Sequence, residues 1–231
     1  VFPELVGNPS YEWIHLDLKR IFGIDELISA ETAEMIWDKT IELLSKPEFK
    51  PRALLKKMNV ETMCSTDDPV DSLEHHKKIN EEEGTTLVRP TWRPDKSMNI
   101  QNKGWKEYII QLAKRTDIAI VSIDDLIRAL KKTHKYFVDC GCKATDHGVE
   151  IPFGYIVSKD HANEIFKKVM GGSKPTKEEI RDYISFMLHE FGKMNAEAGL
   201  VMQIHIGAVP NVRDSLFEKL GPDVGGDISN H

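Results

Sequence analysis

Short apolar runs alternate with longer amphipathic stretches from residue 59 onward, and this alternation limits the available folds more than any other feature. The runs lie at 60–66, 85–91, 142–147 and 200–207, and each is followed by residues with helical periodicity. Such alternation is typical of a parallel sheet covered by helices, whose apolar strands are buried on both faces. The pattern therefore predicts an α/β fold with about four βα units.

The first 58 residues have a different pattern, with apolar side chains at helical spacing over 36–44 and no sheet-like alternation. We therefore predict a helical region at 1–58 ahead of the β/α part at 59–231. Pro51 suits the first position of a short helix that runs to Lys57.

Three local patterns predict where helices of the β/α part begin. Ser122 with Asp125, and Thr176 with Glu179, have the spacing of helix-start signals, the second pair that of a capping box. Asp68 followed by Pro69 predicts a further helix that runs to about residue 82 and ends at Gly84. The glycine-rich tail, 221–231, is predicted to be a loop.

The charge and cysteine content exclude several classes of protein. The 31 Lys and Arg residues against 37 Asp and Glu give a net charge of −6, without the basic excess that nucleic acid or an anionic membrane would need. No run approaches the roughly 18 apolar residues of a membrane span. The three cysteines, Cys64, Cys140 and Cys142, are predicted to be buried, reduced thiols of a cytoplasmic protein.

Polar or ionisable residues follow each predicted strand. Asp67 and Asp68 end the first, Arg93 follows the second, Asp146 ends the third and His205 lies at the end of the fourth. Ligands of parallel α/β folds bind at the carboxyl ends of the strands. The sequence therefore predicts a polar rim around a shared pocket.

Structural roles remain open for several of these residues. Asp68 suits a helix cap, and Arg93 could form a structural ion pair with Asp95. Asp146 and His147 are adjacent, so only one of them can face the pocket, and we favour Asp146. His205 could be a hydrogen-bonded core residue.

The chemistry of this set suits a small, polar, anionic substrate. The planar guanidinium of Arg93 would hold a negative charge, while Asp146 and His205 would hydrogen-bond hydroxyl groups or move protons. These groups favour sugar-acid chemistry over acyl or phosphoryl transfer.

Several motifs, in order along nearly the whole chain, resemble the uronate (glucuronate) isomerases of the amidohydrolase superfamily. They are GNPSYEWIHLDLKRIFGI (7–24), TDDPVDSLEHH (66–76), PTWRPDK (90–96), GCKATDHG (141–148), MQIHIGA (202–208) and LGPDVGGDIS (220–229). The resemblance implies a (β/α)8 TIM barrel with an extra helical region. It also implies interconversion of D-glucuronate with D-fructuronate and of D-galacturonate with D-tagaturonate, by proton transfer between C1 and C2, in the bacterial cytoplasm.

The resemblance also assigns roles. Arg93 and Asp146 would bind the substrate, with Arg93 on its carboxylate, and His205 would face the metal or the reacting end of the sugar. Asp146 and His205 are thus the catalytic candidates, and His205 is the candidate metal ligand. The implied metal is divalent, usually zinc.

The sequence departs from the family pattern in two ways. The H-x-H pair and the last-strand Asp expected to bind the metal are missing, and four strands make only half of a barrel. A half barrel has two open edges. We therefore expect either that the chain is the central part of a longer polypeptide or that it folds only with a partner on the open edge.

Two other functions fit the same residues. One is a metal-dependent hydrolase of the same superfamily, and the other is a truncated, non-catalytic protein that binds sugar acids. The sequence leaves open a homo-oligomer, and it predicts neither nucleic-acid nor membrane partners.

Overall fold

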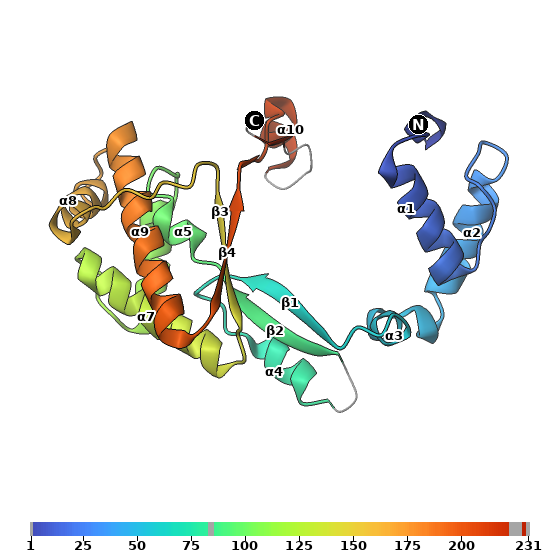
Figure 1. Ribbon diagram of the computed structural model, residues 1–231, viewed down its shortest axis with the longest axis horizontal. Coiled ribbons are helices and arrows are strands. Elements are labelled where there is room, and N and C mark those ends of the chain that lie inside the picture. The colour runs from blue at the N-terminus through green and yellow to red at the C-terminus, as the bar shows by residue number, and fades with distance from the viewer. Residues whose placement is uncertain (1, 83–85, 222–227, 230–231) are drawn as a thin grey trace. The chain divides into compact units, whose positions relative to one another are not determined.

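The computed structural model describes residues 2–82, 86–221 and 228–229 (Figure 1). The chain divides into two units, the first made of Val1–Glu61 with Gly84–Thr86 and the second of Thr62–Glu83 with Leu87–His231. Gly84, predicted to end a helix, and residue 85, predicted to begin a strand, lie outside the described residues.

The first unit is helical. Its elements are the 3-10 helix η1 (Phe2–Leu5), α1 (Pro9–Asp17), the π-helix η2 (Leu18–Phe22), α2 (Ala33–Leu44), the 3-10 helix η3 (Pro47–Phe49) and α3 (Pro51–Lys57). Leu18, Ile24 and Ile36 form its small buried cluster. Pro51 occupies the start of α3, as predicted, because its missing N–H would have no partner in the first turn.

The second unit alternates strands with helices along the chain. Its elements are β1 (Thr62–Asp67), α4 (Glu74–Asn80), β2 (Leu87–Trp92), α5 (Asp95–Met98), α6 (Trp105–Thr116), α7 (Ile123–Asp139), β3 (Ala144–Val149), α8 (Lys159–Met170), α9 (Lys177–Ala198), β4 (Val201–Ile206), β5 (Ala208–Val209), α10 (Asp214–Leu220) and β6 (Ile228–Ser229). Within the described residues, no helix has both the length and the apolar character that a membrane crossing requires.

The four longer strands form one parallel sheet in the order β1-β2-β3-β4. Neighbours in the chain are thus neighbours in the sheet, and every connection steps in the same direction. This is the winding of a (β/α)8 barrel, whereas a doubly wound sheet reverses its strand order. The predicted α/β sheet of about four βα units is confirmed.

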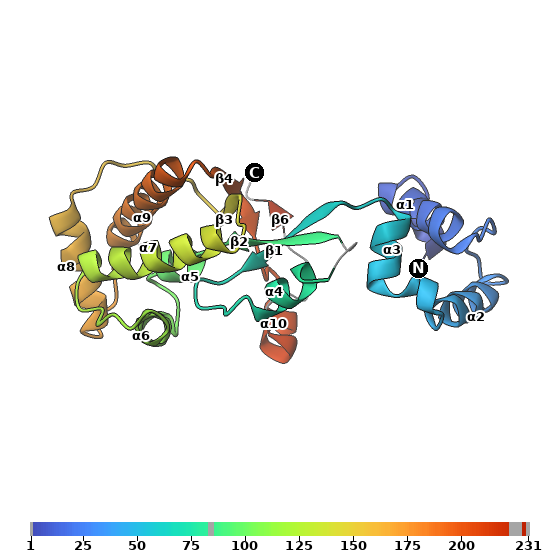
Figure 2. The same cartoon turned by 90° about the horizontal axis from the view of Figure 1, so that it is seen from below.

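One face of this sheet carries the core of the second unit. Helices α6, α7, α8 and α9 gather on that side of the sheet (Figure 2). Trp92 of β2 is fully buried there, with its ring edge-on to His134 of α7 and to Phe191 of α9. Its indole N–H donates to the Thr133 hydroxyl at 3.1 Å, so the polar atom of this fully buried ring is hydrogen-bonded.

The helix-start signals had different outcomes. Ser122 and Thr176 cap α7 and α9 as predicted, the latter in a full capping box with Glu179. The helix predicted after Asp68 is wrong over its first turn, since α4 begins only at Glu74. The Asp68 carboxylate instead accepts the Val70 N–H at 3.1 Å, and this local turn competes with helix formation.

Two further sequence predictions differ from the structure. The third strand runs from Ala144 to Val149 rather than over 142–147, so Asp146 lies within the strand and not at its end. Cys64 is exposed rather than buried, because β1 is an outer strand of the sheet.

In the tail, β6 pairs with β5 where a loop was predicted, and residues 222–227 and 230–231 lie outside the described part.

Candidate active site

The face of the sheet opposite the helices collects the polar side chains of the predicted rim. Side chains alternate along a strand, and Trp92, Thr145 and His147 face the helices. Asp146 of β3 therefore faces the other way, and β4 aligns so that His205 lies beside Gly148 on that same face. Arg93 follows Trp92 directly and also lies on that face. Strand alternation thus explains why these residues meet.

Arg93, Asp146 and His205 form a continuous row of ionisable groups. Arg93 Nη1 lies 3.4 Å from Asp146 Oδ2, and His205 Nε2 contacts Asp146 Oδ1. The Thr66 hydroxyl donates to Asp146 Oδ2 at 3.4 Å. The Asp146 side chain is only 7% exposed, whereas those of Arg93 and His205 are 40% and 60% exposed. The structure therefore brings the three predicted residues together, with the carboxylate buried between two accessible basic groups.

Arg93 also forms the ion pair with Asp95 that the sequence left open as its structural role. Its Nε donates to Asp95 Oδ2 at 2.8 Å, and the Gly148 N–H donates to the same oxygen at 2.9 Å. A Cβ at Gly148 would lie 2.6 Å from Arg93 Nη2, too close for a side chain. Residue 148 must therefore be glycine for the guanidinium to lie flat against β3.

Burial shifts the pKa values of two titratable groups near the Arg93 guanidinium, Asp95 and His147. It raises the pKa of Asp95 above the usual value, although the hydrogen bonds from Arg93 and Gly148 act in the opposite direction. It lowers the pKa of His147 to about 4, so this imidazole is neutral at pH 7. Arg93 thus rests on a buried carboxylate with a neutral histidine behind it.

The two aspartates at the end of β1 do not join this group. Asp68 accepts the Tyr108 hydroxyl at 2.9 Å and pairs with Lys96 at 3.0 Å. Asp67 accepts the Ser65 hydroxyl at 2.7 Å and lies 3.5 Å from His76 of α4. Both carboxylates therefore fix local structure around β1, and the contribution of β1 to the polar face is Thr66.

The described residues do not form a metal site by themselves. None of their His, Cys, Asp and Glu side chains gather into a group of three or more suited to an ion. A catalytic zinc takes three protein ligands, and His205, already in contact with Asp146, would offer one. No chemistry is therefore assigned to a metal in this arrangement.

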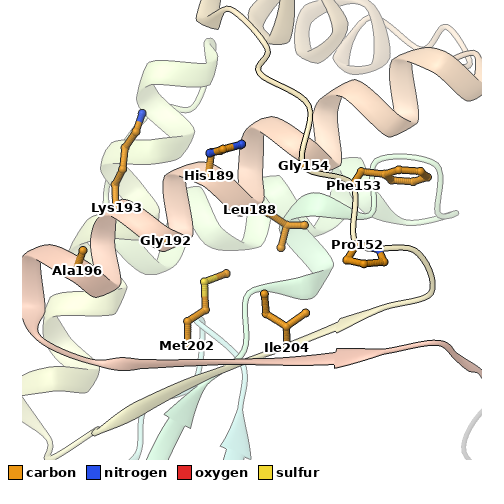
Figure 3. A pocket seen from close by; sticks show the side chains of 10 residues that line it. All are labelled: Pro152, Phe153, Gly154, Leu188, His189, Gly192, Lys193, Ala196, Met202 and Ile204. Atoms are coloured by element: carbon orange, nitrogen blue, oxygen red, sulfur yellow. The ribbon is translucent and has the colours of Figure 1, made fainter.

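An apolar groove of about 500 Å³ lies on the helix-covered side, away from these charged groups. Met202 and Ile204 of β4 point toward α9 there, opposite Leu188, while Phe153 borders the groove from the loop after β3 (Figure 3). Its lining is mostly apolar, with His189 and Lys193 as the ionisable members, and includes neither Arg93 nor Asp146 nor His205. The groove is therefore separate from the residues predicted to bind the substrate.

Sequence reasoning missed Gly148 beside Arg93, and it expected His147 only as a packing or hydrogen-bonding residue. Side-chain alternation along the third strand could have shown this arrangement. If Asp146 faces one side of the sheet, Gly148 faces the same side and His147 faces the other. Predicting the strand two residues too early hid it, since Gly148 then lay beyond the strand.

Comparisons with known proteins agree on one family. A sequence model of the glucuronate isomerase family matches residues 1–231. Among curated proteins, the uronate isomerase of Thermotoga maritima is 50% identical over 232 residues, with 100% of this chain and 51% of the relative covered. That of Phocaeicola vulgatus is 42% identical, with 97% and 48% covered. The chain spans about half the length of the curated relatives it matches.

Solved structures give the same result. The crystal structure of uronate isomerase from Thermotoga maritima matches with a TM-score of 0.95 at 48% identity, over 100% of this chain and 51% of that one. Glucuronate isomerase from Caulobacter crescentus matches with a TM-score of 0.93 at 29% identity, over 100% and 48%. These matches confirm the predicted fold class and favour neither the hydrolase nor the non-catalytic alternative.

Proposed function

The chain belongs to the glucuronate isomerase family, and we propose that it interconverts D-glucuronate with D-fructuronate and D-galacturonate with D-tagaturonate. The observation that carries this proposal is the contact of Arg93, Asp146 and His205 on one face of the sheet. The family match independently favours an aldose–ketose isomerase with a sugar-acid substrate.

Substrate binding is assigned to Arg93 and Asp146. The guanidinium is held by Asp95, and the Arg93 side chain is 40% exposed. A sugar carboxylate would bind there through charge-assisted hydrogen bonds, which are the stronger class. Asp146 beside it would accept hydrogen bonds from the sugar hydroxyls.

The proton transfer is assigned to Asp146 and His205. In an aldose–ketose isomerisation, a base removes the proton from C2 while the carbonyl oxygen O1 gains one, which gives an enediol. C1 then gains a proton and the O2 hydroxyl loses one, so the product is an isomer of the substrate. His205 Nε2 and Asp146 Oδ1 are in contact, so a proton can be exchanged between them. An imidazole and a carboxylate are both groups that can act as general acid or base.

The zinc ion implied by the family resemblance stays part of the proposal, with His205 as the residue of this chain that would face it. No step is derived through it, since the described residues form no metal site. A bacterial cytoplasmic setting and a homo-oligomer are proposed on the same resemblance.

Ketose formation from D-glucuronate tests the proposal directly. The protein is incubated with D-glucuronate, and D-fructuronate is measured. Arg93→Ala should lower kcat/KM about a hundredfold, because losing one partner of a hydrogen-bonded charge pair costs about 3 kcal/mol. Arg128→Ala is the matched control, since Arg128 makes an exposed ion pair with Asp125 on α7.

Three outcomes would separate the alternatives. Ketose formation that depends on Arg93 supports the isomerase. Hydrolysis of amide or ester substrates without ketose formation would favour the hydrolase. Binding of D-glucuronate without turnover would favour the non-catalytic alternative, and unchanged kinetics in Arg93→Ala would remove Arg93 from the site.

A further inference from the structure

A chain of buried polar side chains runs from helix α9 to the Arg93 guanidinium. Asn195 Nδ2 of α9 donates to the Thr145 hydroxyl at 2.7 Å, and that hydroxyl lies 2.8 Å from His147 Nε2. His147 Nδ1 lies 4.0 Å from Asp95 Oδ1, and Asp95 Oδ2 holds Arg93 Nε at 2.8 Å. Asn195, Thr145 and His147 are all buried. The helix-covered face is thereby connected to the proposed substrate site.

The direction of donation along this chain fixes the tautomer of His147. The Thr145 oxygen accepts from Asn195, so its single hydrogen is available to His147 Nε2. At its other end, Asn195 Oδ1 lies 3.1 Å from His134 Nε2, which suits an imidazole N–H donor. Nε2 of the neutral His147 ring is then an acceptor, so the ring proton is on Nδ1.

The reverse direction would be unfavourable at Asp95. It would place the proton of His147 on Nε2 and leave the lone pair of Nδ1 facing the carboxylate at 4.0 Å. Both His147 Nδ1 and Asp95 Oδ1 are buried and have no hydrogen-bond partner among the described residues. An N–H facing a carboxylate oxygen offsets part of that desolvation, whereas two facing acceptors add to it.

We propose that His147 is a positioning residue: its Nδ1–H faces the Asp95 carboxylate at 4.0 Å and attracts it electrostatically, and Asp95 in turn holds the Arg93 guanidinium in place for the substrate carboxylate. That Arg93 binds the substrate carboxylate rests on the proposed function. Asp95 Oδ1 faces His147, while Asp95 Oδ2 accepts from Arg93 Nε and from the Gly148 N–H, so the orientation of the carboxylate sets that of the guanidinium.

Packing keeps the imidazole in this orientation. The ring is fully buried and stacks on Phe191, with centroids 5.3 Å apart and an interplanar angle of 15°. Its burial also lowers its pKa to about 4, which keeps it neutral at pH 7. A neutral ring has a single N–H, so the tautomer decides whether that N–H points to Asp95 or to Thr145.

Nitrogen-15 NMR of the histidine side chains measures this tautomer without requiring turnover. At pH 7 we expect His147 to show a protonated Nδ1 and an unprotonated Nε2, with its signals identified by their loss in His147→Gln. A proton on Nε2, or on both nitrogens, would overturn the proposal. A wild-type protein without isomerase activity would sink the proposed function, yet the tautomer of His147 would still be decided.

Two substitutions of His147 test the positioning role. In His147→Asn the amide lies near the former Nδ1 and can still donate to Asp95, whereas in His147→Gln it lies near the former Nε2 and keeps only the Thr145 contact. Both delete the stacking on Phe191, so both should lose stability to a similar extent. Their comparison therefore isolates the donor to Asp95.

We expect His147→Gln to raise the KM for D-glucuronate about tenfold with kcat within about threefold, and His147→Asn to restore most of that KM. Solvent exchange of the Arg93 Nε–H should also be about tenfold faster in His147→Gln than in His147→Asn. This second readout requires no turnover. Equal exchange rates in the two variants would contradict the positioning role.

Discussion

The two inner strands of the sheet and the two outer strands differ sharply in burial, and the difference does not follow their sequences. Three residues of β2 and four of β3 are buried, but none of β1 or β4 is. Yet the exposed strand β4 has the more apolar sequence, VMQIHI, while the buried strand β3 has the more polar sequence, ATDHGV. Burial in this sheet therefore follows the position of the strand rather than its hydrophobicity.

The inner strands owe their burial to neighbours on both edges and to helices α7 and α9 over one face. Trp92 and His147 both contact Phe191 of α9, so each strand contributes to a single interlocked core. The outer strands have one neighbour each in the sheet. Substitutions in the inner pair should therefore cost far more stability than equivalent ones in exposed positions.

The largest effect is expected for Trp92→Ala. The side chain is fully buried, contacts two rings and donates a hydrogen bond to Thr133, so its loss leaves a large cavity and removes that hydrogen bond. We expect a loss of about 4 kcal/mol in the free energy of unfolding, measured by urea denaturation. The control is Trp37→Ala on α2, where the ring is exposed and the cost should stay below about 1 kcal/mol. Equal losses would contradict the importance of the inner strands.

The fold was predictable because its signals are local or repeat along the chain. Alternation of apolar runs with amphipathic stretches located the four strands and their helices, and the capping box at Thr176 located the start of α9. The turn at Asp68 was not predictable, because its Asx hydrogen bond and the capping of a helix use the same residue types. The exposure of β4 was not predictable either, since periodicity reports hydrophobicity and not what covers the strand.

The inner strands also carry a pH dependence of stability, through His147 of β3. Burial lowers the pKa of His147 to about 4, from about 6.5 when unfolded. Above pH 6.5 neither state binds the proton, and the contribution to stability is complete. Between pH 6.5 and 4 the unfolded state binds it and the folded state does not, so stability falls as the pH falls.

The expected loss over this window is about 3 kcal/mol, since each pKa unit corresponds to about 1.4 kcal/mol. Urea denaturation at pH 7 and pH 4.5 measures it, with His147→Asn as the variant that lacks the titrating ring. The variant should lose less stability than wild type. Other groups near His147, namely Asp95, Asp146, Arg93, His134 and His205, are common to both proteins, so the difference between them reports His147. Parallel pH curves would contradict the lowered pKa.

The next comparison is between Gly148 on the polar face of β3 and Gly192 of helix α9. Gly148→Ala places a methyl group 2.6 Å from Arg93 Nη2 on the polar face, so the guanidinium must move. We expect KM for D-glucuronate to rise about tenfold, with the fold retained. Gly192→Ala on α9 is the control, because its Cβ would lie 3.9 Å from Met202 Sδ, an ordinary contact. An unchanged KM in Gly148→Ala would show that the position of Arg93 tolerates displacement.

The candidate site was predictable in its residues but not in its support. Arg93, Asp146 and His205 each follow or belong to an apolar strand, and the sequence grouped them on that basis. Their contact depends on the register between β3 and β4, which places His205 beside Gly148 and which no local pattern encodes. The chain through Asn195, Thr145 and His147 joins residues up to 50 positions apart, so only tertiary structure reveals it.

The smallest effect is expected on an outer strand. Val201 of β4 is 62% exposed, whereas Val149 of β3 is 7% exposed, so the same substitution to alanine samples both environments. Val201→Ala should change the free energy of unfolding by no more than about 0.5 kcal/mol, because the deleted methyl groups are already in contact with water. Val149→Ala should cost about 1 to 2 kcal/mol through lost burial. Urea denaturation of both variants measures the difference. A Val201→Ala cost as large as that of Val149→Ala would mean that β4 is covered in solution, by a second copy or by further polypeptide, and that its apolar sequence does report its true environment.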